Sequence, residues 1–235
     1  GFDVYAENRD WTVEFCSENS NPITLDFSGF RTHYGGQFPD PDPQEYLDYD
    51  YMTINYPGAS YVAYNDDTPQ FSFTSQSTCI TIGFHSDGDG MIDSGWVAEI
   101  YAVPPPFNND PLDAEELIVG NSCSPSFYSN KGAFSTTSLE SPPCKEYFGG
   151  DVWFRLDVPA SGAVKIETFP GTLDYAILDI YSSADATITS SERIACVDDG
   201  GVMPSVILNR TPGETLYIRL FGEQAKSGLF GICAT

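Results

Sequence analysis

Positively charged residues are scarce in this sequence. Its 235 residues include 10 Lys and Arg against 34 Asp and Glu, a formal net charge of −24, and residues 1–106 contain no Lys. A field of this sign repels phosphate backbones and anionic lipid headgroups. Long apolar runs are missing as well, since no stretch of about 20 apolar residues occurs. The composition therefore argues against nucleic-acid binding and direct membrane insertion.

Histidine is almost absent, and the common catalytic motifs are missing. The two histidines are His33 and His85, and there is no H-E-x-x-H, no G-x-S-x-G and no glycine-rich phosphate loop. His85, Ser86 and Asp87 are consecutive, but neighbours on a strand point to opposite faces and cannot line up as a relay. With 34 acids, close carboxylate pairs arise by chance, and none lies in obviously apolar surroundings. We expect a protein without enzymatic activity.

The six cysteines form no C-x-x-C pair, which favours disulfides over zinc. Disulfides indicate an oxidising compartment, so we expect a secreted, extracellular or cell-surface protein. Two cysteines lie in the first half and need no partner elsewhere, whereas the other four allow three pairings. We expect the pairs Cys16–Cys79, Cys123–Cys144 and Cys196–Cys233.

Short stretches of alternating apolar and polar residues dominate the chain. This period of two is typical of strands with one buried face, and nowhere do ten residues show a convincing period of 3.6. The inward-facing residues that we expect include Trp11, Val13, Phe15, Ile23, Leu25, Phe27, Met52, Ile54, Ile80, Ile82, Phe84, Trp96, Ala98, Ile100, Val152, Phe154, Leu156, Val164, Ile166, Ile177, Tyr181, Leu216, Ile218 and Leu220. The pattern predicts an all-β fold of two β-sandwich, jelly-roll-like domains.

A proline-rich stretch interrupts the pattern. It reads Ala102-Val-Pro-Pro-Pro-Phe-Asn-Asn-Asp-Pro111, and three consecutive prolines favour a stiff, extended spacer. We therefore expect one domain over residues 1–103, a short Pro-rich linker over 104–111 and a second domain over 112–235.

An acidic loop follows one of the expected strands. Asp87, Asp89 and Asp93 lie within seven residues that also contain several glycines. Carboxylates this close repel one another unless they are solvated or share a cation, and Ca²⁺ takes six to eight oxygen ligands from such loops. Asp and Gly also favour turns for purely conformational reasons, so a solvated hairpin loop is the alternative.

Two further groups are candidate binding residues. Asp198 and Asp199 precede two glycines and predict either a second cation site or a turn capped by their side chains. Tyrosines beside the acidic residues 40–45 are candidates for ligand binding, because exposed aromatic rings can stack on sugars or contact proteins. These tyrosines are Tyr46, Tyr49 and Tyr51.

Residues 8–101 resemble a CUB domain of the bacterial kind. The matching motifs are Asn8-Arg-Asp-Trp-Thr-Val-Glu-Phe-Cys16, Ile23-Thr-Leu-Asp-Phe-Ser-Gly-Phe30, Tyr49-Asp-Tyr-Met-Thr-Ile54 and Phe84-His-Ser-Asp87 with Gly95-Trp96. The resemblance implies that Asp50 and Asp87 ligate calcium. The family's third ligand, a glutamate, falls near His33 here. We consider Glu45 as its replacement and Asp89 as a further oxygen donor. The family's glycine-rich first strand has no counterpart before Asn8.

Residues 107–235 resemble the bacterial pre-peptidase C-terminal domain. The matching motifs are Asp151-Val-Trp-Phe-Arg-Leu156, Pro159-Ala-Ser-Gly162, Leu178-Asp-Ile-Tyr181, Ala195-Cys-Val-Asp-Asp-Gly-Gly201, Thr211-Pro-Gly-Glu-Thr-Leu-Tyr-Ile-Arg219 and Gly228-Leu-Phe-Gly-Ile-Cys233. The two resemblances imply β-sandwiches attached to secreted proteins, which bind protein or glycan or act as spacers and are not themselves catalytic.

These observations lead to one main hypothesis and one alternative. The main hypothesis is a non-enzymatic, calcium-binding adhesion or structural protein of a bacterial surface. It would assemble by strand complementation with other protein subunits, which include copies of itself, because a sandwich that lacks a strand has an unpaired edge. The alternative is an accessory region of a secreted protease or glycoside hydrolase that binds protein or carbohydrate.

Overall fold

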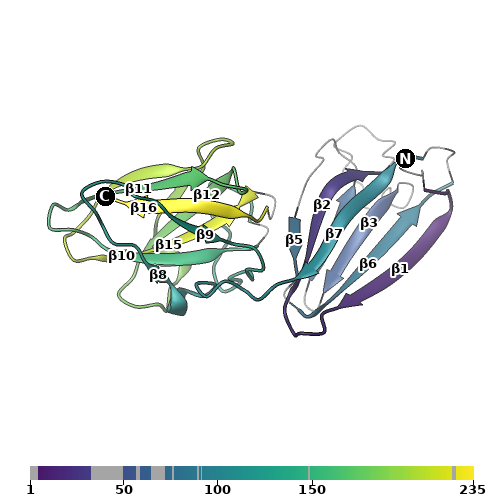
Figure 1. Cartoon of the computed structure of the whole chain (residues 1–235), viewed down its shortest axis with the longest axis horizontal. Helices are drawn as coiled ribbons and strands as arrows, with labels where there is room; N and C mark the ends of the chain where they lie inside the picture. Colours follow the sequence, from purple (N-terminus) through teal and green to yellow (C-terminus); the bar gives the residue numbers. More distant parts are fainter. Residues whose placement is uncertain are drawn as a thin grey trace. The chain divides into compact units, whose positions relative to one another are not determined.

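The computed structural model describes residues 5–32, 50–56, 59–64, 72–75, 77–88, 90, 92–147, 149–223 and 226–235. The chain divides into two compact units, Gly1–Ala102 and Val103–Thr235. Each unit is a sandwich of two β-sheets, so the predicted all-β class is confirmed (Figure 1). No helix in the described residues is long and apolar enough to cross a membrane.

The first unit consists of a four-stranded sheet with the order β1-β6-β3-β4 and a three-stranded sheet with the order β5-β2-β7. All of the neighbouring strands are antiparallel. The strands are β1 (Arg9–Cys16), β2 (Ile23–Arg31), β3 (Tyr51–Tyr56), β4 (Ala59–Tyr64), β5 (Ser72–Thr74), β6 (Cys79–Ser86) and β7 (Gly95–Ala102).

The core of the first unit lies between these two sheets. The alternating residues of β2, β3 and β6 are buried as predicted, among them Leu25, Ile54 and Ile82. The central strands thus bury one face each, as their period of two requires. Trp11, in contrast, is 40% exposed, which corrects the expectation that it is a core residue.

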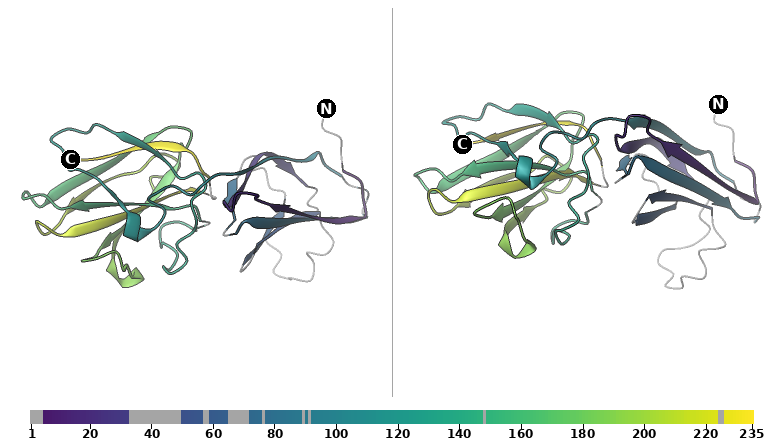
Figure 2. Two further views of the ribbon diagram at one scale, coloured as in Figure 1. Left: turned by 60° about the horizontal axis from the view of Figure 1, so that its bottom comes forward. Right: turned by 90° about the horizontal axis from the view of Figure 1, so that it is seen from below.

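The second unit contains a five-stranded sheet and a four-stranded sheet (Figure 2). Their orders are β13-β12-β15-β10-β8 and β14-β11-β16-β9. The elements are η2 (Pro111–Asp113), β8 (Glu115–Glu116), β9 (Ser126–Ser129), β10 (Val152–Asp157), β11 (Ala163–Pro170), β12 (Ala176–Ser182), η3 (Ser190–Glu192), β13 (Arg193–Val197), β14 (Ser205–Asn209), β15 (Thr215–Gly222) and β16 (Leu229–Ala234).

The five-stranded sheet of the second unit is buried on both faces. One face packs against the other sheet through residues such as Phe154, Leu178 and Ile218. The opposite face carries Trp153, Tyr181 and other buried side chains. The loop residues Leu139, Cys144 and Tyr147 pack on this second face, so loops cover a surface that an antiparallel sheet commonly leaves in water.

The predicted linker is an ordered part of the second unit. Asn108 is 1% exposed, its side chain donates a 2.9 Å hydrogen bond to the Trp153 carbonyl, and its own carbonyl accepts from the Trp153 N–H at 2.8 Å. Asp110 caps η2 through a 2.9 Å bond from the Leu112 N–H. The prolines therefore shape an entry segment that packs against β10, and residues 104–111 are not a free spacer.

Two of the three predicted disulfides are wrong. Cys16–Cys79 is confirmed, and it joins β1 to β6 with a Cα–Cα distance of 4.1 Å. The remaining bridges are Cys123–Cys233 and Cys144–Cys196, in place of Cys123–Cys144 and Cys196–Cys233. The physical reason is that β16, with Cys233, pairs with β9 just after Cys123, whereas Cys144 and Cys196 both belong to the covered face of the other sheet.

Candidate metal site and acidic clusters

Two predicted calcium ligands meet at one end of the four-stranded sheet. Asp50 directly precedes β3, Asp87 directly follows β6, and the two strands pair with Tyr51 opposite His85. This register places the Asp50 side chain beside the start of the acidic loop. Its Oδ1 accepts a 2.8 Å hydrogen bond from the Asp87 N–H.

The Asp50 carboxylate is buried, with 1% of the residue exposed. Its Oδ2 accepts a short hydrogen bond from the Tyr5 hydroxyl. No cationic side chain in the described part of the chain forms an ion pair with it. Burying an ionised carboxylate without a counter-charge is costly. A hard cation beside Asp50 would remove that cost, and the carboxylates of Asp50 and Asp87 are ligands of the type that calcium takes.

The structure does not place the other three predicted ligands, Asp93, Glu45 and Asp89, beside Asp50. Asp93 accepts a 2.6 Å hydrogen bond from the N–H of the next residue, Ser94, and so caps its own loop. Glu45 and Asp89 lie outside the described residues. The structure therefore brings Asp50 and Asp87 together, while the positions of the remaining two carboxylates are still predictions.

The N-terminal segment supports the site in a way that the sequence did not reveal. Besides the contact of Tyr5 with Asp50, the Asn8 N–H donates to the Asp87 carbonyl at 2.8 Å, and Ser86 Oγ donates to the Ala6 carbonyl at 2.8 Å. The Tyr5 ring also packs edge-on against Phe84 at 5.1 Å between centroids. An isolated tyrosine near the start of a chain gives no pattern by which this role could be predicted.

The side chains of Tyr51 and His85 form a small stack beside the site. Their ring centroids are 4.9 Å apart, and His85 Nδ1 lies 2.7 Å from Asp10 Oδ1 on the neighbouring strand β1. His85 therefore lies beside the candidate site, with Asp10 as its carboxylate partner. Tyr51 is half-buried against His85, and Tyr46 and Tyr49 lie outside the described residues.

The contacts of Asp198 and Asp199 favour a capped turn over a second cation site. Asp198 Oδ1 accepts from the Tyr175 hydroxyl at 2.5 Å and from the Gly200 N–H at 3.0 Å. The Tyr175 hydroxyl is the main reason why the pKa of Asp198 lies below its usual range, and Lys145, with Nζ 3.8 Å from Oδ2, also contributes. Asp199 accepts separately from the Ser205 N–H at 3.0 Å. A lysine thus already supplies the positive charge.

Groups of three metal-ligating side chains occur twice in the part of the chain that the structure describes. One consists of Glu14, Cys16 and Cys79, and the other of Cys123, Glu167 and Cys233. Both contain a disulfide, whose sulfur atoms are not thiolates and do not act as metal ligands. Neither group is therefore a candidate metal site.

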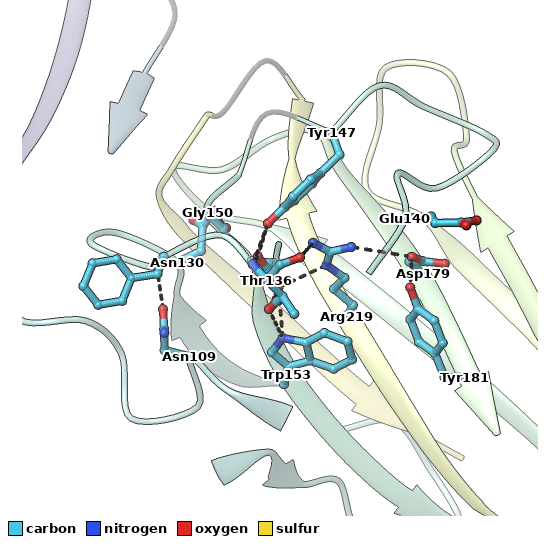
Figure 3. A network of polar contacts seen from close by, with 12 residues as sticks. Asn109, Asn130, Thr136, Glu140, Tyr147, Gly150, Trp153, Asp179, Tyr181 and Arg219 are labelled. Atoms are coloured by element: carbon cyan, nitrogen blue, oxygen red, sulfur yellow. Dashed lines mark hydrogen bonds and ion pairs between the residues drawn. The ribbon is translucent and has the colours of Figure 1, made fainter. Parts of the chain in front are cut away.

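A buried polar network lies on the covered face of the second unit (Figure 3). Arg219, Asp151 and Asp179 all have side chains that are 0% exposed. Arg219 Nε donates to Asp151 Oδ2 at 3.0 Å, and its Nη1 is 3.9 Å from Asp179 Oδ2. Arg193 Nε donates to Asp179 Oδ1 at 2.7 Å, so each buried carboxylate has a guanidinium partner.

Neutral groups complete this network. Asp151 accepts hydrogen bonds from Trp153 Nε1 at 2.9 Å, from the Thr136 N–H at 2.9 Å and from the Tyr147 hydroxyl. The Arg219 guanidinium lies over the Tyr147 ring, 3.9 Å from its centroid. Burial opposes the charge of Arg219, but Asp151 and the other acceptors outweigh it and raise the pKa of Arg219 above its usual value. These contacts hold the covering loop on the sheet, and within them Arg219 Nη1 is buried without a hydrogen-bond partner among the described residues, with Asp179 Oδ2 at 3.9 Å.

Comparisons with known proteins give only distant structural similarities. No protein-family model and no curated protein matches the sequence. The CUB1-EGF-CUB2 domains of human MASP-1/3 are 12% identical, with 100% of this chain and 96% of that chain covered and a TM-score of 0.36. The equivalent rat MASP-1 domains give 12% identity, 99% and 94% coverage and a TM-score of 0.34. The extracellular region of zebrafish Gpr126/Adgrg6 gives 10% identity, 100% and 31% coverage and a TM-score of 0.38. Similarities this weak establish neither a family nor a function for the chain.

Proposed function

We propose that this chain is an extracellular, calcium-binding protein without enzymatic activity that acts by binding other macromolecules, as an adhesion or structural subunit of a bacterial surface. The observation that carries the calcium assignment is the buried Asp50 carboxylate, which has Asp87 beside it and no cationic side chain among its described partners. Its partners among the described residues are the Tyr5 hydroxyl and the Asp87 N–H.

Calcium at this position would have a structural consequence for binding. Asp50 belongs to the start of β3 and Asp87 to the loop after β6, so one ion would fix that loop on the end of the sheet. Tyr51, His85 and Asp93 lie on the same segments. The ion would thereby order a rim of polar and aromatic side chains on which another protein or a glycan could dock.

Two features of the chain support the extracellular and binding parts of the proposal. All six cysteines are paired, and disulfides persist in oxidising compartments outside the cytoplasm. In the first unit, β1 and β7 are edge strands of their sheets among the described residues. An edge strand can accept a strand from another subunit, which is the mode of assembly that we propose.

Thermal unfolding with calcium and with a chelator tests the calcium assignment. For the wild-type chain, chelation should lower the midpoint of the unfolding transition of the first unit. A ligand present at 100 times its Kd stabilises the native state by about 2.7 kcal/mol. Asp87→Ala should abolish this sensitivity, because it removes one of the two carboxylates. Asp198→Asn is the matched control and should respond to the chelator like the wild type, because Asp198 pairs with Lys145.

Two outcomes would contradict the assignment. The first is a wild-type midpoint that does not change on chelation. The second is an Asp87→Ala protein that stays as sensitive as the wild type. Calorimetric titration of Asp50→Asn with calcium gives an independent measurement, and it should show no binding event at the affinity of the wild type.

A further inference from the structure

The two sheets of the first unit end on the same side of the sandwich in β1 and β7. Among the described residues, β1 pairs only with β6, and β7 pairs only with β2. The rings of Trp11 on β1 and Trp96 on β7 are 5.5 Å apart, so these two edges face each other. Figure 1 shows β1 at the outer margin of its sheet.

The apolar side chains along this side point toward the interior but remain accessible. Three of these side chains are paired across strands with core residues, and paired residues share a sheet face. The pairs are Trp11 with Phe84, Val13 with Ile82, and Ile100 with Leu25. The core partners are at most 4% exposed, whereas Trp11, Val13 and Ile100 are 40%, 37% and 38% exposed. The core is therefore closed along its middle and open along this side.

A cavity marks one end of the opening. It has a volume of about 410 Å³, and Phe15 from β1 and Ile23 and Ile100 from β2 and β7 line it. We call the surface formed by Trp11, Val13, Phe15, Trp96, Ala98 and Ile100 the β1/β7 groove.

Three of the four charged residues on β1 and β7 are acidic. β1 carries Asp10 and Glu14, β7 carries Glu99, and Arg9 is the only basic residue on these two strands. All four are exposed. A strand added beside β1 would bring its own outward side chains opposite Asp10 and Glu14, where like charges destabilise and opposite charges stabilise. A second copy of this acidic chain is therefore a poor fit.

We propose that the β1/β7 groove binds one extended strand of a different polypeptide, with apolar side chains at alternating positions and basic or neutral residues between them. This inference rests on the proposed function of the chain as a binding subunit and specifies its partner. The strand pairs with the edge of β1 that no described strand occupies, and its apolar side chains cover Trp11, Val13 and Ile100. The edge offers a row of backbone hydrogen-bonding groups, which suits a strand better than a helix or a sugar.

Calorimetric titration of the full chain with three capped synthetic peptides tests the chemistry of the partner. The first peptide has four Val-Lys repeats, the second four Val-Glu repeats and the third four Ser-Lys repeats. We expect saturable binding of the Val-Lys peptide, with the affinity of the other two lower by about tenfold or more. Equal binding of the Ser-Lys peptide would overturn the proposal, because it would show that charge alone suffices. Equal binding of the Val-Glu peptide would overturn the part that concerns the basic residues.

Two matched substitutions test whether the peptide binds at the β1/β7 groove. Val13→Asp puts a charge into the β1/β7 groove and should weaken binding of the Val-Lys peptide by about tenfold or more. Val62→Asp is the matched control, since Val62 is also a 37% exposed valine on an edge strand of the same sheet. Val62 lies opposite Thr53, on the other face of the sheet and at its other edge. The Val62→Asp protein should therefore bind the Val-Lys peptide like the wild type. Unchanged affinity of Val13→Asp would overturn the proposal.

Two further measurements keep the test conclusive. If Val13→Asp does not fold, Val13→Thr keeps a β-branched shape while adding a hydroxyl, and it should still weaken binding measurably. The chelator sensitivity of each variant shows separately whether the proposed calcium function is intact. Loss of peptide binding with preserved calcium response supports the β1/β7 groove. The wild-type chain could instead assemble with itself and fail to bind the Val-Lys peptide. If Val13→Asp abolished that self-assembly, the partner would be a second copy of the chain, and the proposal of a different polypeptide would be overturned.

Discussion

The two units differ in what surrounds their buried carboxylates and in how far their sheets are covered. In the second unit, Asp151 and Asp179 are buried beside Arg219 and Arg193, which supply positive charge from the chain itself. In the first unit, Asp50 is buried to the same degree, but its described partners are a hydroxyl and a backbone N–H. The second unit neutralises its own carboxylates, whereas the cation that we propose for Asp50 would come from outside the chain.

The surfaces show the same contrast. Loops of the second unit cover the outer face of its larger sheet, and the Cys144–Cys196 disulfide holds them there. The first unit leaves inward-facing side chains of β1 and β7 accessible. On these grounds we place the proposed binding functions of the chain in the first unit.

Removal of Arg219 should have the largest effect on this comparison. Arg219→Met leaves Asp151 and Asp179 buried without their shared guanidinium, and removing one partner of a buried ion pair costs about 3–5 kcal/mol. Urea unfolding followed by Trp153 fluorescence, with Trp11 and Trp96 replaced by Phe, measures the free energy of unfolding of the second unit.

Arg155→Met is the control for that substitution. Arg155 also lies in the same sheet and forms an ion pair with Glu116 at 2.9 Å, but its side chain is 42% exposed. Exposed pairs contribute about 0–1 kcal/mol, so the loss should be correspondingly small. Equal losses for the two variants would mean that the buried network does not distinguish the second unit from the first.

Removal of the Cys144–Cys196 disulfide should have the next largest effect. Cys144→Ser/Cys196→Ser frees the covering loop from β13 and should lower the free energy of unfolding of the second unit by about 2–4 kcal/mol. The same urea experiment provides the measurement. Cys16→Ser/Cys79→Ser should leave the Trp153 transition unchanged, because that bridge lies within the first unit. Peptide mapping without reduction checks the pairing itself, and a Cys123–Cys144 peptide would refute it.

Local pattern was enough to predict most of the strands. The alternation at Ile23, Leu25 and Phe27, and at Val152, Phe154 and Leu156, reports a face buried against a partner sheet, and both segments are strands with those residues buried. β12 shows the limit of this reasoning. Its alternating set Ile177, Asp179 and Tyr181 faces the covering loops, whereas Leu178 and Ile180 face the opposite sheet. Periodicity locates a strand but does not show which further segments cover it.

The cysteine pairs and the candidate site depended on contacts between distant residues. Cys123 and Cys233 are 110 residues apart, and only the pairing of β9 with β16 brings them together. Asp50 and Asp87 were found through their resemblance to a family motif, and the register of β3 and β6 places them side by side. The role of Lys145 beside Asp198 could not be predicted, because no sequence spacing relates a loop lysine to a carboxylate 53 residues later.

The smallest expected effect concerns how the free energy of unfolding of the second unit depends on pH. Arg210, followed by Ser182, holds the pKa of Glu214 at about 2, well below its usual 4.5. Because the folded-state pKa is the lower one, this contact stabilises the second unit fully above pH 4.5. The contribution is lost as the pH falls from 4.5 toward 2. Glu214→Gln should therefore cost about 1 kcal/mol at pH 7, given the partial exposure of the pair, and almost nothing at pH 2.

Urea unfolding of the second unit at a series of pH values measures this difference. Glu146→Gln is the control, because Glu146 is exposed and forms no ion pair within the described residues, so its curve should follow the wild type throughout. A gap between wild type and Glu214→Gln that persists unchanged to pH 2 would show that the substitution acts through packing. A gap that closes over this range would show that the second unit obtains stability from a carboxylate paired with its own arginine. The first unit, whose buried Asp50 has no such partner in the described structure, should obtain the equivalent stability from added calcium.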